Sequence, residues 1–230
     1  MNNQDEIKTF YRRNLPHYQS PGNTYFVTFR LAGSLPAHVI TRLKTENKNQ
    51  LEQIAGISNN KMKREKYEQF KSDYFDKFDL MLAKFAESPK WLDDDEIART
   101  VTELIHYYDG KEYDLIAYTI MPNHVHIIFR PPDVDRSEAS IANTNNKLRS
   151  SASHYIVTKI LQNIKSKSAL KANAKLKRSG AFWQHESYDH VVRDEEELCK
   201  IIEYVLNNPV KAGLVEYRDE WKRSYCKYDL

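Results

Sequence analysis

The chain has 230 residues, 40% of them hydrophobic, which is enough for one sizeable core. Its net charge of +3 is too small to indicate a nucleic-acid partner by itself, so local clusters of charge are more informative than the total. Cys199 and Cys226 form no CxxC pair, which excludes a redox framework and favours a reduced, cytoplasmic protein. The apolar runs are too short to span a membrane and we find no signal peptide, so we expect no membrane attachment.

The first part of the chain predicts one strand followed by helices. Residues 25–31 contain alternating apolar positions and predict a strand. From about Val39 to Phe85 the composition favours helices, with a break near residues 56–60 and aromatic residues at helical spacing that indicate a core-facing side. This region is longer than one crossover between strands needs, so we expect a helical insertion at about residues 39–88 of a single domain spanning residues 1–230.

The middle of the chain predicts a helix, a pair of strands and a second helix. Acidic residues 93–96 are typical of a helix start, and Gly110 follows the last periodic residue. Residues 113–121 and 123–130 predict the second and third strands, and residues 143–164 predict a further helix.

A basic segment follows at residues 165–178, with six basic residues and no acidic one. It is compatible with a solvated connector and equally with a phosphate-contacting patch.

Two histidines lie in the third predicted strand. The spacing of two between His124 and His126 places both imidazoles on one face, because strand side chains alternate. Val125, Ile127 and Phe129 then face a core on the other side. Such a pair can bind a divalent metal, although histidines at this spacing also occur as ordinary hydrogen-bonded residues of a half-buried strand.

The last predicted helix begins after Asp194, a suitable N-cap, and we expect Pro209 to end it near Asn208. Tyr204 and Asn208 are four residues apart, so the phenol and the carboxamide project from the same side. One helix could therefore supply a nucleophile and a metal ligand. The alternatives are that Tyr204 is a border residue of an amphipathic helix and that Asn208 only terminates it.

The order of elements predicts the fold class. It runs strand, helical segments, two strands, helix, a strand-like segment at residues 182–192 and a final helix. This order is compatible with an α+β fold, namely a ferredoxin-like antiparallel sheet with helices packed on one side and a helical insertion.

The sequence resembles the REP-associated tyrosine transposases, a branch of the nucleases named for a His-hydrophobic-His pattern. The most specific motifs are MPNHVH at residues 121–126 and NPVKAG at residues 208–213. The resemblance implies the same fold, with the histidine strand central in the sheet and the Tyr204 helix across its open face. It also implies that His124 and His126 bind Mg²⁺ or Mn²⁺, that Tyr204 is the nucleophile and that Asn208 completes the metal shell.

The family cuts single-stranded DNA. Its tyrosine oxygen attacks a phosphodiester in line, leaving a 5′-phosphotyrosine link and a free 3′-hydroxyl that can reverse the step. A phenol with a pKa of about 10 is a weak nucleophile at neutral pH, so a cation that neutralises charge on the phosphate suits this chemistry. The implied partner is a small palindromic DNA hairpin and the implied location is the cytoplasm at the nucleoid, with a monomer and a homodimer both open.

Basic residues are the candidates for DNA binding. Tyr11, Arg12 and Arg13 combine stacking and phosphate-binding groups, and Lys211 follows the Tyr204 helix. The basic segment adds Lys165, Lys167, Lys171, Lys175, Lys177 and Arg178. We expect the helical insertion to add further DNA contacts.

Two other functions fit the same residues. One is a hairpin-specific DNA-binding regulator that retains the fold without significant cleavage, and the other is a metal-dependent hydrolase in which water attacks and Tyr204 is structural. The functions differ in their dependence on Tyr204: a Tyr204→Phe change abolishes a covalent adduct in the transposase, preserves DNA binding in the regulator and preserves hydrolysis in the hydrolase.

Overall fold

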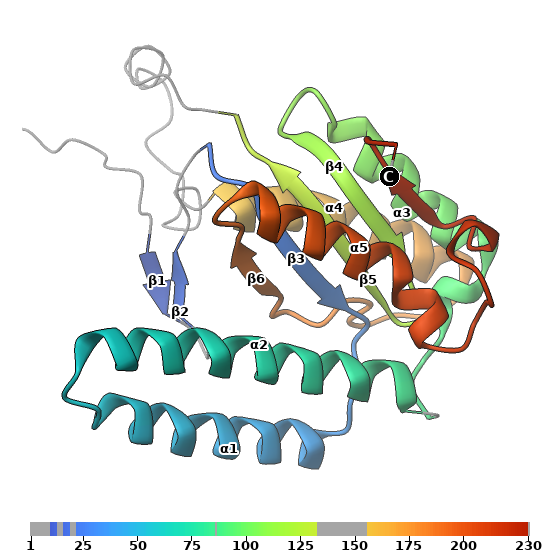
Figure 1. The fold of residues 1–230 in the computed structure, drawn as a ribbon. Helices are drawn as coiled ribbons and strands as arrows, with labels where there is room; N and C mark the ends of the chain where they lie inside the picture. Colours follow the sequence, from blue (N-terminus) through green and yellow to red (C-terminus); the bar gives the residue numbers. More distant parts are fainter. Residues whose placement is uncertain (1–9, 13–15, 19–21, 86, 133–155, 230) are drawn as a thin grey trace, which may run out of the picture.

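A computed structural model describes residues 10–12, 16–18, 22–85, 87–132 and 156–229. Its main sheet has five antiparallel strands in the order β6-β3-β5-β4-β7 (Figure 1). Their bounds are β3 (Tyr25–Arg30), β4 (Asp114–Ile120), β5 (His124–Arg130), β6 (Tyr188–Val191) and β7 (Ser224–Cys226). The strands β1 (Phe10–Arg12) and β2 (Pro16–Tyr18) form a separate two-stranded sheet. The histidine strand β5 is central, as the resemblance implied.

Helices cover both faces of the main sheet. The helices α3 (Asp95–Tyr108) and α4 (Ile156–Lys175) pack on one face, and α5 (Glu195–Lys211) crosses the other (Figure 1). Short 3-10 helices lie at η1 (Trp91–Asp93) and η4 (Arg218–Glu220). The α+β antiparallel fold is therefore confirmed, with α5 on the face expected for it. None of the described helices combines the length and the apolar composition that a membrane crossing needs.

Strand alternation explains the two hydrophobic layers. Val125, Ile127 and Phe129 of β5 are fully buried in the core beneath α3 and α4, as predicted from their period of two. On the opposite face a smaller cluster joins strand residues such as Phe26 to Ile202 and Val205 of α5. The sheet thus keeps one face for the main core and uses the other to hold α5.

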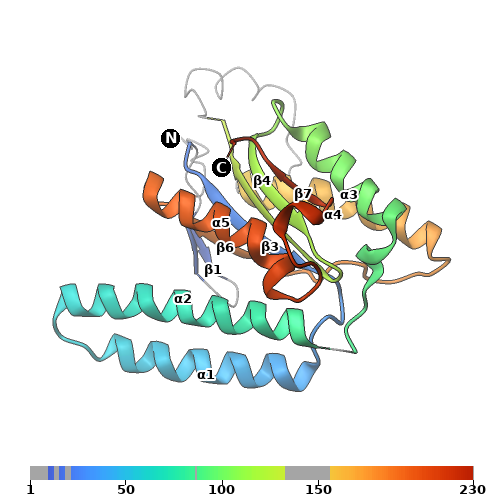
Figure 2. The ribbon, with the colours of Figure 1, turned by 45° about the vertical axis from the view of Figure 1, so that its right-hand side comes forward.

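The predicted helical region forms a hairpin of α1 (Ala37–Ala55) and α2 (Asn60–Lys84), with the break at the expected place. Figures 1 and 2 show the two helices side by side, with α2 between α1 and the rest of the domain. An ion pair between Lys77 and Glu46 joins them. Phe75 and Leu82 turn toward the domain and are buried, so the aromatic periodicity does mark a core-facing side.

Two sequence predictions about helix ends were wrong. Residues 165–175 belong to α4 instead of a connector, because the buried residues Ile164, Ser168 and Ala172 recur every four positions and hold that stretch against the core. The helix α5 continues past Pro209 to Lys211. A proline in the last turn removes only one backbone donor. The backbone amide of Ala212 still donates to the carbonyl oxygen of Asn208 at 2.9 Å, so the helical hydrogen bonding continues past Pro209. The predicted helical residues 143–155 lie outside the described residues.

Candidate metal and nucleophile site

The two histidines of β5 face each other across a buried space. Their Nε2 atoms are 3.1 Å apart, and both side chains are almost completely buried. Each Nδ1 has a neighbour of its own: Thr28 Oγ1 on β3 lies 2.7 Å from that of His126, and Asn123 Oδ1 lies 2.5 Å from that of His124. These contacts orient the rings and leave both Nε2 atoms directed into the same space.

A carboxylate from the helical hairpin completes the group. Oδ1 of Asp79 on α2 lies 3.1 Å from Nε2 of His126 and 3.5 Å from Nε2 of His124. This oxygen is buried and accepts no hydrogen bond from any residue that the structure describes. One atom from each of the three residues lies within 4.8 Å of the others, and nitrogen and oxygen donors of this kind suit a divalent cation. The residues present therefore fit the metal that the resemblance implies.

The other carboxylate oxygen reaches the helix α5. The Tyr204 hydroxyl donates to Asp79 Oδ2, and Nδ2 of Asn208 donates to the same oxygen at 2.9 Å. Their spacing of four on α5 brings both groups to Asp79, as the sequence predicted for one helix face. Asp79 therefore links the histidine pair to the candidate nucleophile.

Burial and charge set the protonation states in this site. Burial opposes ionisation of Asp79, but the neighbouring imidazoles and the Tyr204 hydroxyl outweigh it and hold the pKa of Asp79 below its ordinary value. Burial, together with the neighbouring His126 imidazole, lowers the pKa of His124 to about 3. Burial and the Asp79 carboxylate raise the pKa of Tyr204 above its ordinary value. Near neutral pH the site therefore holds an anionic carboxylate, a neutral His124 that can bind a metal, and a protonated phenol.

Aromatic side chains enclose the polar group. Phe75, one helical turn before Asp79, packs with ring centroids 5.6 Å from Tyr204, 6.2 Å from His126 and 5.1 Å from Phe26. It is only 7% exposed, so α2 covers the site with an apolar residue as well as supplying the carboxylate. Such a surrounding strengthens the electrostatic interactions inside.

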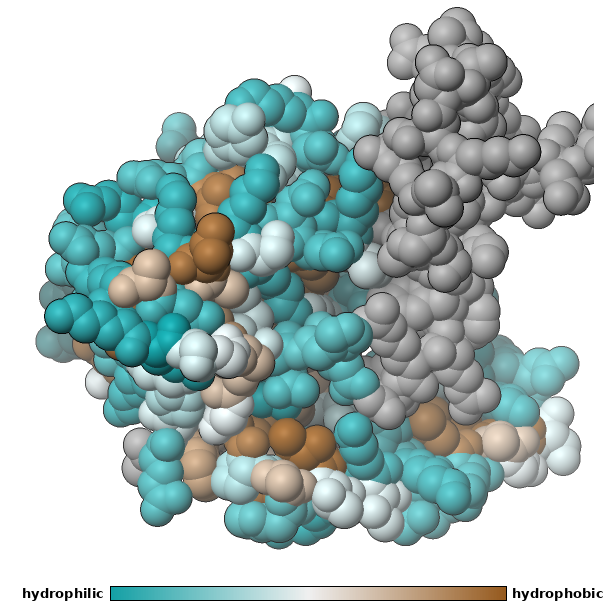
Figure 3. Space-filling model, turned by 180° about the vertical axis from the view of Figure 1, so that it is seen from behind, coloured by the Kyte–Doolittle hydropathy of each residue, from teal (hydrophilic) through white to brown (hydrophobic). Residues whose placement is uncertain are grey.

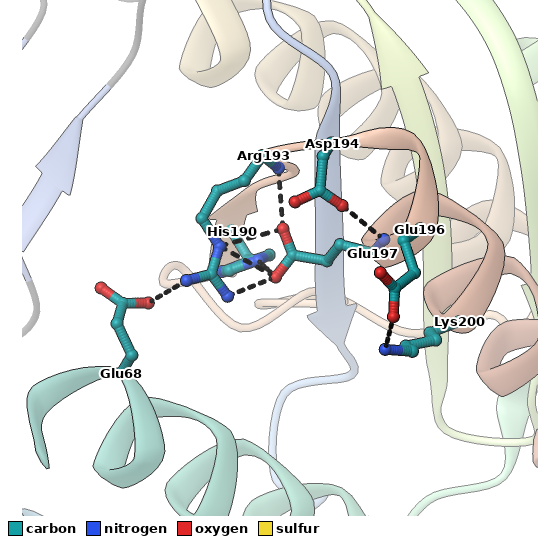
Figure 4. A network of polar contacts seen from close by, with 7 residues as sticks. All are labelled: Glu68, His190, Arg193, Asp194, Glu196, Glu197 and Lys200. Carbon is teal, nitrogen blue, oxygen red and sulfur yellow. Dashed lines mark hydrogen bonds and ion pairs between the residues drawn. The ribbon is translucent and has the colours of Figure 1, made fainter. Parts of the chain in front are cut away.

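A polar network holds the start of α5 (Figure 4). Asp194 caps the helix by accepting from the Glu197 amide at 2.8 Å, as predicted. The Glu197 carboxylate contacts Nε2 of His190 on β6 at 3.1 Å and accepts from the Arg193 guanidinium at 2.7 Å. Arg193 also lies 3.4 Å from Glu68 on α2. The network thus connects the Tyr204 helix to β6 and to the hairpin.

The predicted site residues fall into separate groups. Tyr204, Asn208, His124 and His126 come together, and Nζ of Lys211 lies 4.4 Å from the centre of the Tyr204 ring. In Figure 1 the helix α4 lies behind the sheet. Figure 3 shows the molecule from behind, and the surface on that side is mostly hydrophilic. The basic residues of α4 and the turn after it therefore lie on the other side of the sheet from Tyr204.

Several of those basic residues have protein partners. Lys165 donates to Ser187 Oγ at 3.0 Å, Lys167 donates to Tyr108, and Lys175 lies 3.1 Å from Asp94. Arg178 stacks over Trp91 with 4.0 Å between its guanidinium carbon and the ring centre. Lys171 is exposed, and Lys177 has a positive φ of 51° just after the helix. Their role in DNA binding stays a prediction. So does that of Tyr11 and Arg12 on β1, while Arg13 lies outside the described residues.

Sequence reasoning missed Asp79. The available signal was its place between Phe75 and Leu82, which are both buried, at helical spacings of four and three. An acidic residue on the apolar side of a helix needs a partner for its charge. The pattern of α2 therefore pointed to a functional carboxylate, although the identity of its partners needed the tertiary structure.

Comparisons with known proteins agree with the motifs. No family model matches the chain. Over 119 residues the chain is 26% identical to a protein of Haemophilus influenzae named as a REP-associated tyrosine transposase, and the match covers 51% of this chain and 61% of that protein. A solved structure of a REP-associated tyrosine transposase bound to a REP hairpin is similar with a TM-score of 0.48 and 16% identity, covering 93% of this chain and 80% of that one. The resemblance to this family is confirmed.

Proposed function

We propose that the chain is a metal-dependent single-strand DNA endonuclease and transposase that cleaves and rejoins DNA at small hairpin repeats through a 5′-phosphotyrosine intermediate. The observation that carries the proposal is the position of Asp79, whose two oxygens face the histidine pair and the Tyr204 hydroxyl respectively. A nucleophile and a group suited to bind a metal thus share one carboxylate. The sequence similarity to a tyrosine transposase supports the same function.

His124, His126 and Asp79 would hold the divalent cation. When bound, such an ion neutralises charge that develops on the phosphate and fixes its position. Mg²⁺ usually prefers oxygen ligands, so two imidazoles and one carboxylate suit Mn²⁺ at least as well. Asn208 contacts Asp79 Oδ2 at 2.9 Å, and its role as a further metal ligand is part of the proposal.

The chain's own residues prepare the nucleophile. Asp79 Oδ2 accepts the Tyr204 hydrogen bond and is therefore the atom placed to receive the phenolic proton. In the proposed step the Tyr204 oxygen forms a bond to phosphorus, the bond from phosphorus to the 3′-oxygen breaks, and a proton restores the 3′-hydroxyl. Because the energy of the phosphodiester is kept in the phosphotyrosine, the reverse attack rejoins the strand without another cofactor.

The proposed partner is a hairpin of single-stranded DNA, so the protein would act in the cytoplasm at the nucleoid. All five residues of the proposed site meet within a single chain. A monomer and a homodimer are both compatible with that arrangement.

The test is incubation with Mn²⁺ or Mg²⁺ and a single-stranded hairpin oligonucleotide from repeats flanking the gene, followed by denaturing electrophoresis and intact protein mass. We expect a DNA-linked protein that is absent from Tyr204→Phe and unaffected in Tyr217→Phe, a control at a tyrosine that is 61% exposed. Hairpin binding without an adduct would favour the regulator. Hydrolysis that survives in Tyr204→Phe would favour the water-attacking hydrolase.

A further inference from the structure

Arg30, the last residue of β3, lies on the same face of the sheet as the histidine pair. In the antiparallel register Thr28 is opposite His126 and Arg30 is opposite His124. Thr28 Oγ1 contacts the His126 ring directly, and residues two apart on a strand share a face. Figure 1 shows β3 running toward the α1–α2 hairpin, and Arg30 at the end of this strand contacts Phe78 of α2.

The Arg30 guanidinium is a buried cation that has no carboxylate partner among the residues that the structure describes. The residue is 7% exposed, and Nη1 donates to Ser34 Oγ at 2.9 Å. Its other near neighbour is the Phe78 ring, whose centre lies 5.7 Å from the guanidinium carbon. Among the described residues no carboxylate is within ion-pair distance, although the charge of Glu186 acts on it from farther away. A buried charge usually has an ionic partner, because its desolvation is otherwise uncompensated.

An unsatisfied polar atom lies next to the same aromatic residues. Asn47 on α1 is 6% exposed, and its Oδ1 accepts no hydrogen bond within the described part of the chain. Asn47 is a polar neighbour of Tyr74, whose ring stacks 6.4 Å from that of Phe78, the residue under Arg30. Among the described residues, Arg30 therefore has no ion-pair partner and Asn47 Oδ1 has no hydrogen-bond donor, and Tyr74 and Phe78 connect the two side chains. A nucleotide, with an anionic phosphate and hydrogen-bonding groups, offers partners for both.

We propose that Arg30 binds a backbone phosphate of the DNA strand, next to the phosphate that the cation at Asp79, His124 and His126 would position. Arginine suits this role because its guanidinium forms two parallel hydrogen bonds to a phosphate, and only one of its donors is used by Ser34. Burial lowers the pKa of Arg30 to about 10, so the side chain stays charged at neutral pH. The inference rests on the proposed function and adds to it one residue that binds the phosphate backbone of the DNA.

The experiment measures binding of a fluorescent single-stranded hairpin oligonucleotide by anisotropy, in Ca²⁺ and over a series of salt concentrations. We expect Arg30→Gln to weaken binding about tenfold, the loss of one charge-assisted contact. The slope of log affinity against log salt should fall by about 0.7, the value for one phosphate contact on a single strand.

Two further probes separate the charge from the geometry of the contact. Arg30→Lys should keep the slope and lose part of the affinity. A neutral methylphosphonate placed next to the cleaved bond should weaken the wild type and leave Arg30→Gln unchanged.

An Arg30→Met variant separates DNA binding from folding. If Arg30 serves DNA, replacing an unpaired buried charge by an apolar side chain should maintain or raise the melting temperature while DNA affinity falls. A lower melting temperature with unchanged affinity and slope would overturn the inference and assign Arg30 a structural role. If Arg30→Gln binds like the wild type while adduct formation persists, only this inference fails. A wild type that neither binds the oligonucleotide nor forms an adduct refutes the proposed function and this inference together.

Discussion

Oδ1 of Asp79 lies 3.1 Å from Nε2 of His126, so a carboxylate of the helical hairpin meets the central strand of the sheet. The hairpin is therefore part of the candidate site. Any change that displaces α2 also removes an oxygen donor from the histidine pair. Metal binding and the position of the hairpin should consequently depend on each other.

Removing the Asp79 charge should weaken metal binding. We expect Asp79→Asn to reduce the affinity for Mn²⁺ at least tenfold, because even groups that only support metal ligands contribute that much. Electron paramagnetic resonance of free Mn²⁺ measures this affinity without DNA. Asp73→Asn, at an exposed aspartate of the same helix, is the matched control and should bind Mn²⁺ like the wild type. Equal affinity in both variants would exclude Asp79 as a ligand.

Local sequence patterns predicted the parts of the site that lie on one element. His124 and His126 share a strand face, and Tyr204 and Asn208 share a helix face, so a period of two and a spacing of four were sufficient. Asp79 was missed because its partners lie on β5 and α5, and no local spacing encodes that contact. Arg30 was missed for the same reason, since its neighbours His124 and Phe78 come from distant segments.

The wrong helix ends have a comparable cause. The run of lysines after Lys165 looks like a solvated connector, yet burial of Ile164, Ser168 and Ala172 against the core extends the helix through it. Tertiary packing outweighed a charge pattern. At the end of α5 the residues around Pro209 kept their helical hydrogen bonds, so one missing donor did not end the helix.

Glu197 should stabilise the protein in a pH-dependent way. Burial disfavours its charge, but hydrogen bonds from Arg193 and His190 outweigh this and lower the pKa of Glu197 to about 2, from 4.5. Its stabilisation is therefore complete above about pH 4.5 and is lost as the pH falls toward 2. We expect Glu197→Gln to lower the free energy of unfolding by about 1–2 kcal/mol at pH 7 and by much less near pH 2.

Urea denaturation at a series of pH values measures this difference. Glu196→Gln is the control, because the Glu196 side chain is 80% exposed and pairs only with Lys200 among the described residues. Its effect should stay within about 0.5 kcal/mol at every pH. A Glu197→Gln penalty that is the same at pH 7 and pH 2 would contradict the role given to the carboxylate charge.

Phe75 should hold the hairpin closed over the site. Its ring packs against Tyr204, His126 and Phe26, and removing it leaves a cavity between α2 and the sheet. Replacing a buried phenylalanine by alanine typically costs about 3–5 kcal/mol. Since α2 and α5 both cover the buried histidines, the proposed function requires one of these helices to move before DNA reaches them. We expect Phe75→Ala to accelerate amide hydrogen exchange in residues 60–84 while β3 and β5 remain protected.

Hydrogen exchange with mass spectrometry resolves the two regions. Met62→Ala, at a residue of α2 that is 53% exposed, should exchange like the wild type. If Phe75→Ala instead accelerates exchange equally in the sheet and in α2, the hairpin and the sheet unfold as one unit, and separate opening of the hairpin is excluded.

Lys211 and Lys171 test which face of the sheet meets the DNA. Nζ of Lys211 lies 4.4 Å from the centre of the Tyr204 ring, whereas Lys171 is an exposed residue of α4, on the opposite layer. A cation next to the nucleophile can contact the phosphates on either side of the cleaved bond. We expect Lys211→Gln to weaken binding of a single-stranded oligonucleotide severalfold and to reduce the slope of log affinity against log salt by about 0.7.

Lys171→Gln is the control and should leave the affinity and the slope unchanged when the oligonucleotide is a short unpaired strand. If Lys171→Gln weakens binding only when the oligonucleotide carries the hairpin, the double-stranded stem lies on α4. If instead Lys171→Gln weakens binding of the short strand and Lys211→Gln does not, the strand does not follow α5 and the proposed site is wrong.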